Sequence, residues 1–304
     1  MNYEQSTMNK IRNYLSLIKF SHSIFALPFA MIGFFLGVNS VETGSGNESW
    51  YYQYGKLFIL VVLCMIFARS AAMAFNRYLD RNFDAKNPRT SIREVPAGII
   101  SAKNALLFTI INCILFVVCC FFINKICFYL SPVALLVILG YSYTKRFTPL
   151  CHLILGVGLS LAPIGAYLAV TAEFDHLPIV FSVTVLCWVT GFDIIYALQD
   201  EQFDKENNLY SIPAAIGKKY ALRVSRLSHF FAAVTIIYAG SIGNFGIYYW
   251  IGAILFIGML FYQQSIVKPN DLKRVNLAFM TTNGIASVVF AIFTIADLFL
   301  KTNY

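Results

Sequence analysis

The sequence predicts an all-α membrane protein that crosses the bilayer many times, and three observations support this fold class. Of the 304 residues, 58% are hydrophobic and only 12% are charged, whereas soluble domains carry about 25% charged residues. Apolar stretches of about 20 residues, long enough to span a bilayer, recur along the whole chain. Basic residues are concentrated in alternate connecting segments. A water-soluble protein is therefore excluded, and we expect a single integral membrane domain over residues 1–304.

The apolar stretches predict nine transmembrane helices. The first is full length, contains Pro28 and is followed by no small-residue cleavage site, so we expect a permanent span rather than a signal peptide. The second and sixth stretches precede the two longest polar loops. In chain order, the expected helices cover residues 20–38, 57–79, 105–123, 128–143, 151–171, 177–199, 228–243, 246–265 and 276–299.

Positive charges indicate the orientation of these helices. With the N-terminus in the cytosol, the cytosolic segments carry nineteen Lys and Arg residues and the outer segments carry three, which is the positive-inside pattern. This distribution explains the net charge of +8 without a nucleic-acid partner. We therefore expect a protein of the inner (cytoplasmic) membrane, with the N-terminus and the loops after the second and sixth helices in the cytosol. Arg69 is the basic residue left inside a span.

Two of the predicted cytosolic loops share the pattern D-x-x-F-D-x-x-N, at residues 80–87 and 200–207. The offset between them is 120 residues, which corresponds to four predicted helices. This spacing predicts two four-helix pseudo-repeats followed by one further helix. In such an arrangement the two motifs would face each other across a central cavity.

Each loop contains a pair of aspartates, Asp80 with Asp84 and Asp200 with Asp204. Residues four apart lie on one face of a helix, so the two carboxylates of each pair point the same way. Magnesium prefers oxygen ligands and is usually held by one or two carboxylates together with substrate phosphates. A single pair could also be a solvated helix end that basic residues balance. The second copy, and Asn76 one turn before the first, favour two Mg²⁺ ions around a diphosphate.

Two ionisable residues lie deeper, within the predicted spans. Arg69 precedes the first motif on the second helix, and Asp193 precedes the second motif on the sixth. Ionisable side chains inside a membrane are costly and tend to be functional. Each of the two could instead be one half of a structural ion pair.

Residues 76–90, N-R-Y-L-D-R-N-F-D-A-K-N-P-R-T, resemble the N-x-x-x-D-x-x-x-D motif of the UbiA superfamily of intramembrane prenyltransferases, including the following N-P-R-T. Residues 193–204 resemble the second aspartate-rich motif of that superfamily, and the resemblance covers essentially the whole chain. The sequence is most similar to the 4-hydroxybenzoate polyprenyltransferase-like branch. Two departures leave the acceptor open. The segment 19–29 differs from the R-x-x-K-P-x-G opening of the ubiquinone enzymes, and Arg77 stands where an acidic residue often follows the motif Asn.

The resemblance implies Mg²⁺-dependent transfer of a polyprenyl group from a polyprenyl diphosphate to an aromatic acid, of the 4-hydroxybenzoate type, in quinone biosynthesis. The naphthoate prenyltransferases of menaquinone synthesis, including the futalosine-pathway type, are the alternative. Metal ions held by the four motif aspartates would stabilise the charge that develops on the leaving diphosphate. Further contacts to the diphosphate are expected from Asn76, Arg89, Lys145 and Arg146.

The carbocation that remains reacts with water, so the cavity has to be dry, and aromatic faces stabilise the charge. The candidates for this role are Tyr141, Tyr143 and Tyr196. An acceptor with a carboxylate needs a cation, for which the candidates are Arg69, Lys19, His22 and Ser23. Asp193 would accept the proton that the ring releases, or would pair with Arg69 instead. His152 and His229 are expected to be packing or interface residues.

Two other classes of membrane protein share some of these features. A cation-coupled transporter also has intramembrane carboxylates and internal repeats, but transporter sites usually lie near the midplane at broken helices, whereas these four aspartates fall at the cytosolic ends of two helices. A CDP-alcohol phosphotransferase also uses a D-x-x-x-D pair, but the D-G-x-x-A-R run of that family is absent. Prenyl chain length and oligomeric state are not specified by the sequence.

Overall fold

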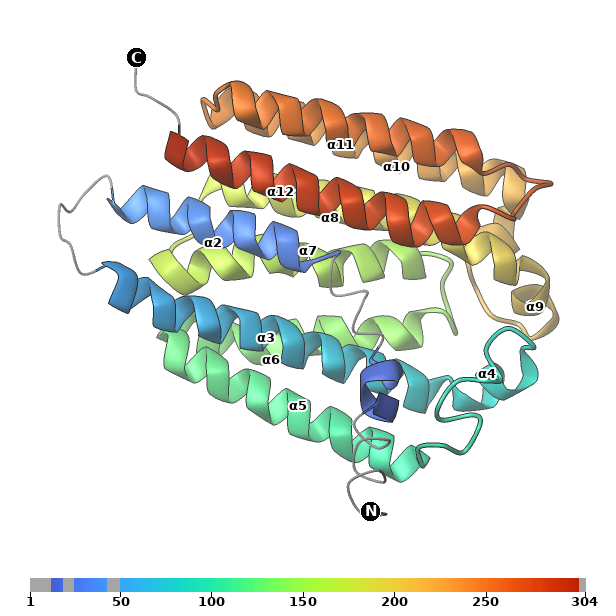
Figure 1. The fold of residues 1–304 in the computed structure, drawn as a ribbon. Helices are drawn as coiled ribbons and strands as arrows, with labels where there is room; N and C mark the ends of the chain where they lie inside the picture. The colour runs from blue at the N-terminus through green and yellow to red at the C-terminus, as the bar shows by residue number, and fades with distance from the viewer. Residues whose placement is uncertain (1–11, 19–24, 43–49, 301–304) are drawn as a thin grey trace, which may run out of the picture.

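The computed structural model describes residues 12–18, 25–42 and 50–300 of the chain. In these residues long helices run side by side along one common direction (Figure 1). This arrangement confirms the all-α architecture predicted from the sequence. Nine of the helices in the described part of the chain have 16 residues or more: α2 (Leu27–Glu42), α3 (Trp50–Leu79), α5 (Ala102–Ile123), α6 (Lys125–Thr144), α7 (Cys151–Thr171), α8 (His176–Ala197), α10 (Ile212–Ile242), α11 (Ile247–Ile266) and α12 (Asn283–Leu300).

By length and composition, seven helical segments of the described residues are able to cross a membrane. The two remaining long helices differ from them in length or composition. α2 has 16 residues and begins at Leu27, with Pro28 in its first turn, where the missing N–H has no intrahelical partner to lose. α10 has 31 residues rather than the expected span 228–243, because a basic first half precedes its apolar second half. Gly217 allows a kink in that first half with φ of 76°.

Side chains of the local sequence define where several helices begin. Ser101 accepts a hydrogen bond from the N–H of Asn104 at the start of α5, and Asn124 accepts one from Cys127 at the start of α6. These are ordinary N-cap residues, whose oxygen replaces a missing backbone acceptor. The N-cap residue of α11, Gly246, has no side chain that could accept a hydrogen bond from the first turn. Asp297 of α12 supplies the carboxylate, at 2.6 Å from the Gly246 nitrogen and 3.2 Å from the Tyr249 nitrogen.

Because Asp297 is 1% exposed and satisfies two backbone N–H groups, we expect Asp297→Ala to lower stability. The loss should be about 1.5–3 kcal/mol, the range for hydrogen bonds to a charged group. Thermal unfolding of the purified protein in detergent measures it, with Glu173→Ala on an exposed loop as the control. An unfolding temperature equal to that of the control variant would contradict this role of Asp297.

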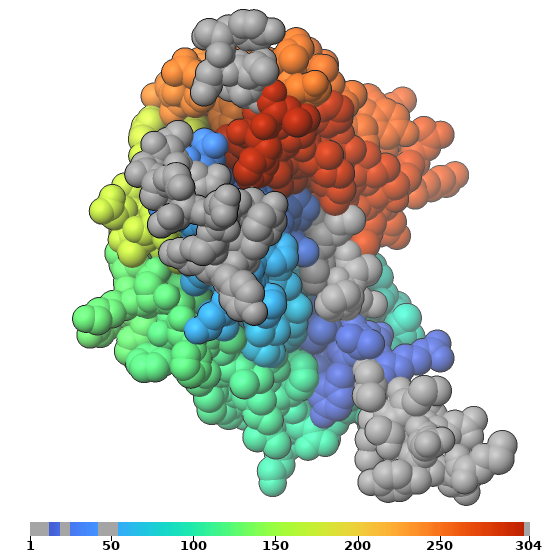
Figure 2. Space-filling view, turned by 60° about the vertical axis from the view of Figure 1, so that its left-hand side comes forward, coloured from blue at the N-terminus to red at the C-terminus, as the bar shows by residue number. Residues whose placement is uncertain are grey.

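The centre of the bundle is α8, which packs against α7 and α10. Its Trp188 is fully buried and donates a hydrogen bond from Nε1 to Asn283 Oδ1 at 2.9 Å. α2 packs against α7 so closely that a Cβ at Gly33 would lie 2.0 Å from the Pro163 carbonyl oxygen, as small residues permit between membrane helices. In the space-filling view, α12 in red and the green helices α5 and α6 lie on opposite sides of the blue α2 and α3 (Figure 2).

Two short helices follow α3 and α8 at the same end of the bundle (Figure 1). α4 (Arg81–Lys86) begins one residue after Asp80, and α9 (Glu201–Glu206) begins one residue after Asp200. The two short helices are offset by the same 120 residues as the two sequence motifs. The fold therefore places the two copies of the motif in matching positions.

Candidate active site

The first aspartate motif lies at the junction of α3 and α4. Asp80 separates the two helices, and the hydrogen bond from Asp84 N to Asp80 O, at 2.8 Å, continues the helical register across the junction. Both aspartates therefore point to one side, as the four-residue spacing predicts, and both line a pocket. Asn76, one turn earlier, donates from Nδ2 to Asp80 Oδ2 at 2.9 Å and so orients that carboxylate.

The second motif is arranged differently. Between α8 and α9 the chain forms a 3₁₀ turn, η2 (Leu198–Asp200), which winds more tightly than an α-helix. Asp200 lines the pocket, but Asp204 does not. The Asp204 side chain is fully buried, with Lys145 Nζ at 2.7 Å and Ser211 Oγ at 2.8 Å. The expectation that both carboxylates of this pair share one open face is therefore wrong in the described structure, because the tighter turn and Lys145 hold Asp204 inside.

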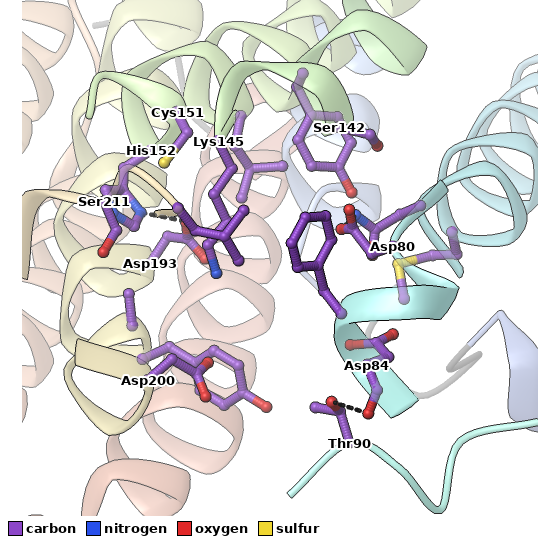
Figure 3. A pocket seen from close by; sticks show the side chains of 18 of the residues that line it. Asp80, Asp84, Thr90, Ser142, Lys145, Cys151, His152, Asp193, Asp200 and Ser211 are labelled. Atoms are coloured by element: carbon purple, nitrogen blue, oxygen red, sulfur yellow. Dashed lines mark hydrogen bonds and ion pairs between the residues drawn. The ribbon is translucent and has the colours of Figure 1, made fainter. Parts of the chain in front are cut away.

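The pocket has a volume of about 300 Å³ and is bordered by both motifs. Figure 3 shows Asp80 and Asp84 on one side and Lys145, Asp193 and Asp200 on the other. Its apolar lining includes Phe25, Phe192 and Phe279, which sequence reasoning did not select among the 28 phenylalanines. Phe279 lies in the π-helical segment η3 (Leu277–Thr282) and packs on Tyr196 with ring centroids 4.2 Å apart. One pocket thus combines charged groups with an aromatic wall.

Each motif aspartate has a basic partner. The guanidinium of Arg89 donates from Nε to Asp200 at 3.0 Å and from Nη1 to the Tyr196 hydroxyl at 2.8 Å. Arg89, Lys145 and Arg146 were the expected diphosphate contacts, and the structure brings all three to the motif carboxylates. The remaining ion pairs are Arg146 to Asp80 at 3.0 Å, Arg93 to Asp84 at 2.8 Å and Lys145 to Asp204 at 2.7 Å.

Two residues of the loop after α4 were missed as site residues. Arg93 pairs with Asp84, and Asn87 donates from Nδ2 to Asp200 Oδ1 at 3.1 Å, which links the two motifs directly. The signal for Asn87 was present, since it is the last residue of the repeated D-x-x-F-D-x-x-N pattern. Nothing in the spacing singles out Arg93, because the turns that bring it back to Asp84 are not visible in the sequence pattern.

Burial changes the acidity of the groups at the membrane surface. It raises the pKa of the Asp80 carboxyl to about 6, although Arg146 acts in the opposite direction. Burial alone would lower the pKa of Lys145, but Asp204 outweighs it and raises that pKa above its usual value. Because burial disfavours the ionised form of Asp80, a positively charged ligand beside this carboxylate would stabilise it.

The donor set fits a hard divalent cation. The oxygen donors at the pocket that belong to the two motifs are the carboxylates of Asp80, Asp84 and Asp200 and the amides of Asn76 and Asn87. In the described part of the chain, no three His, Cys, Asp or Glu side chains form a closed cage. Three carboxylates that open onto one pocket, those of Asp80, Asp84 and Asp200, suit Mg²⁺, which keeps several waters and shares substrate phosphates.

Asp193 pairs with His152, not with Arg69. The distance between His152 Nδ1 and Asp193 Oδ2 is 2.7 Å, and both residues line the pocket. Because His152 Nε2 accepts the Ile212 N–H at 3.4 Å, the imidazole proton belongs on Nδ1, which donates to Asp193. The expectation that His152 is a packing residue is therefore wrong. No sequence pattern connects the two residues, since they are 41 positions apart on different helices.

Tyr141 and Tyr196 line the pocket, but Tyr143 does not. Tyr143 is 48% exposed and lies against the Arg146 guanidinium, 5.4 Å from its ring centroid. Residues two apart on a helix lie on nearly opposite sides, so Tyr141 and Tyr143 could not both face the pocket, and the expectation for Tyr143 is wrong. His229 is buried between helices, with Gln264 at 2.9 Å, as expected for a packing residue.

Of the four candidates for acceptor binding, only Arg69 lies within the part of the chain that the structure describes. Arg69 lines the pocket. Lys19, His22 and Ser23 lie outside the described residues.

A multi-pass helical bundle that carries two aspartate motifs at one end of a charged and aromatic pocket defines the class of intramembrane prenyltransferases. The sequence model of the UbiA prenyltransferase family matches residues 26–285, and the chain belongs to this family. It is therefore a membrane-embedded prenyltransferase.

Curated relatives are similar over most of their length. A 4-hydroxybenzoate octaprenyltransferase of Aliivibrio fischeri (strain ATCC 700601 / ES114) is 30% identical over 254 residues, which cover 81% of this chain and 84% of the relative. A 4-hydroxybenzoate octaprenyltransferase of Shewanella piezotolerans is 28% identical over 235 residues, or 77% of this chain and 82% of the relative.

Solved structures share the fold. The apo structure of a UbiA homologue from Aeropyrum pernix K1 matches with a TM-score of 0.75 and 26% identity, covering 92% of this chain and 98% of that one. A UbiA homologue from Archaeoglobus fulgidus, solved with GPP and Mg²⁺ bound, matches with a TM-score of 0.70 and 21% identity, covering 94% of this chain and 99% of that one. The second likeness concerns the fold alone.

Proposed function

We propose that the protein transfers a polyprenyl group from a polyprenyl diphosphate to the ring of an aromatic acid in quinone biosynthesis, with 4-hydroxybenzoate as the acceptor. The observation that carries this proposal is the meeting of both aspartate motifs at a single pocket that has cations beside the carboxylates and aromatic rings beyond them. The names of the curated relatives support the same acceptor. A naphthoate prenyltransferase of menaquinone synthesis, including the futalosine-pathway type, is the second candidate, because the segment 19–29 differs from the opening of the ubiquinone enzymes and Arg77 stands where an acidic residue often follows the motif Asn.

Asp80, Asp84 and Asp200 would hold Mg²⁺, with Asn76 orienting Asp80. When bound, Mg²⁺ supplies positive charge that stabilises the leaving diphosphate. Asp204 can join these ligands only when Lys145 releases it. The basic side chains that pair with the motif carboxylates are placed to contact diphosphate oxygens through charge-assisted hydrogen bonds; they are Arg89, Arg93, Lys145 and Arg146.

The transfer breaks the bond between the allylic carbon and the diphosphate oxygen, and the electron pair leaves with the diphosphate. A ring carbon of the acceptor then bonds to the allylic carbon. The proton on that ring carbon passes to the Asp193 carboxylate, which His152 orients from behind. The rings of Tyr141 and Tyr196 border the same pocket and would stabilise the allylic cation. Arg69 would bind the acceptor carboxylate, with Lys19, His22 and Ser23 as further candidates.

The location of the aspartates argues against a cation-coupled transporter. Asp80 and Asp200 follow the ends of α3 and α8, not a break near the midplane. Positive charge indicates that this end of the bundle faces the cytosol, because the seven basic residues of the two motif loops (80–101 and 198–211) and of the turn after α6 (145–150) lie there. We place the protein in the inner (cytoplasmic) membrane with this end inside.

An assay on membranes that contain the protein tests the proposal. Mg²⁺ and a polyprenyl diphosphate are supplied with either 4-hydroxybenzoate or a dihydroxynaphthoate, and products are detected by mass. A prenylated 4-hydroxybenzoate is the expected result. Product with the naphthoate alone would mean that the acceptor is a naphthoate and that the site is otherwise as proposed. The absence of prenylated product with any aromatic acceptor would contradict the proposal.

The pKa of Asp80 predicts a pH dependence of metal binding. Protons and Mg²⁺ compete for a carboxylate, and a carboxyl with a pKa of about 6 is ionised at pH 7 but protonated at pH 5. The apparent affinity for Mg²⁺ should therefore be about tenfold weaker at pH 5 than at pH 7. Titration with Mn²⁺, followed by electron paramagnetic resonance, measures this change, and Asp80→Asn should abolish it. Equal affinities at the two pH values would contradict a role of Asp80 as a ligand.

A further inference from the structure

Two arginines of α3, Arg69 and Arg77, line the pocket without a carboxylate partner among the described residues. Arg77 is only 4% exposed, and the Nε atoms of both arginines are buried without a hydrogen-bond partner in the described part of the chain. The hydrogen bond of Arg77 is to a neutral group, from Nη1 to Asn76 Oδ1 at 3.3 Å. Both guanidiniums therefore retain unused donors.

The other basic side chains near the motifs are neutralised. Arg89, Arg93, Lys145 and Arg146 each have a motif aspartate within 3.0 Å. Arg69 and Arg77, on the membrane side of Asp80, are thus the pocket arginines that form no direct ion pair among the described residues, although Asp84 and Glu94 act favourably on Arg77. The pocket thus has a rim at which basic side chains pair with carboxylates, and a wall on α3, formed by Arg69 and Arg77, at which they form no direct ion pair.

The two arginines also affect each other. The charge of Arg77 acts unfavourably on Arg69, and Arg93 acts unfavourably on Arg77, whereas Asp84 and Glu94 act favourably on Arg77. Two like charges in a poorly solvated site repel strongly, and a buried charge without a partner is costly. An anion bound by both guanidiniums would offset both costs. The geometry therefore favours a negatively charged group of a substrate at this wall.

We propose that Arg69 and Arg77 together bind the carboxylate of the aromatic acceptor, and that Arg77 makes the enzyme selective for acceptors that carry one. The inference rests on the proposed function and extends it, since Arg77 was not among the acceptor-binding candidates there. Planar guanidiniums match a carboxylate with paired hydrogen bonds. Met73 lies one turn from each arginine and also lines the pocket, so its thioether offers a surface for the ring.

The test compares Arg77→Gln, Arg69→Gln and Arg77→Lys in the full-length protein. Arg81→Gln is the matched control, because Arg81 bonds to the Tyr78 carbonyl at 2.6 Å and does not line the pocket. Two measurements are made: the KM for acceptor and for prenyl diphosphate, and direct binding of the accepted acid to the purified protein by calorimetry. A phenol without the carboxylate serves as the second acceptor. Thermal unfolding checks that each variant is folded.

We expect the KM and Kd for the acid to rise about 10- to 100-fold in both Gln variants, with Arg77→Lys intermediate and the control unchanged. The KM for the prenyl diphosphate and the turnover of the phenol should stay within about twofold of the wild type. A raised diphosphate KM with unchanged acid binding would overturn the proposal and assign Arg77 to the donor. If Arg77→Gln does not fold, Arg77→Lys decides, and acid binding equal to the wild type in that variant overturns the proposal. Failure of the proposed function is distinct, because the wild type would then form no prenylated product.

Discussion

Replacing Asp200 by Asn should lower kcat/KM by about a hundredfold to a thousandfold, with the helical content unchanged. Asp200 is the point at which the two halves of the site meet, since it accepts from Arg89 Nε at 3.0 Å and from Asn87 Nδ2 at 3.1 Å. The amide removes the negative charge that would hold Mg²⁺ and keeps the size of the side chain. Losing one group that stabilises charge in a transition state costs about this factor.

The matched control for this prediction is Glu201→Gln, one residue further along the chain. The Glu201 carboxylate pairs with Lys205 at 2.7 Å and does not line the pocket, so the variant should retain turnover close to the wild type. The assay follows prenylated product as a function of Mg²⁺ concentration, and the Asp200→Asn enzyme should need more Mg²⁺ for its residual rate. Wild-type turnover in Asp200→Asn would remove the second motif from the metal site.

The fold and the first motif followed from the sequence because both are local patterns. A stretch of about 20 apolar residues has few structures open to it in lipid other than a helix. The spacing of Asp80 and Asp84 survives the break between α3 and α4 because one backbone hydrogen bond carries the helical register across it. At Asp204 the same inference failed, since a 3₁₀ turn intervened that the sequence pattern does not reveal.

The parts of the site that were missed depend on contacts between distant segments. His152 meets Asp193, and Arg93 returns to Asp84 through a series of turns. Aromatic residues are so frequent in this chain that composition cannot select the ones at the pocket, and Tyr143 was chosen although it lies two positions from Tyr141. Helical geometry alone shows that only one of these two tyrosines can face the pocket. Long-range pairing, rather than the local pattern, decides which polar side chains share the pocket.

The second large effect on kcat is expected when the group that takes up the proton of the acceptor ring is removed. Asp193→Asn should lower kcat by about 10²- to 10⁴-fold, because an amide cannot take up the proton that leaves the ring, while both KM values change little. The Asn side chain retains nearly the same volume beside His152, so the pocket should stay intact. A ring-deuterated acceptor distinguishes this step from the breaking of the diphosphate bond. Loss of the proton should become rate-limiting in the variant and produce a primary isotope effect.

Variants of His152 test whether this residue orients Asp193, because His152 acts through Asp193 and not on the substrate. His152→Leu removes the donor at 2.7 Å and leaves the carboxylate without its orienting partner, so kcat should fall about tenfold or more. His152→Gln retains a donor and should recover part of the loss. His176→Leu, at an exposed histidine that contacts the Tyr238 hydroxyl, should behave as the wild type. If Asp193→Asn shows full turnover, or no isotope effect on a reduced kcat, the proton passes to another group, and the pair of His152 and Asp193 is structural.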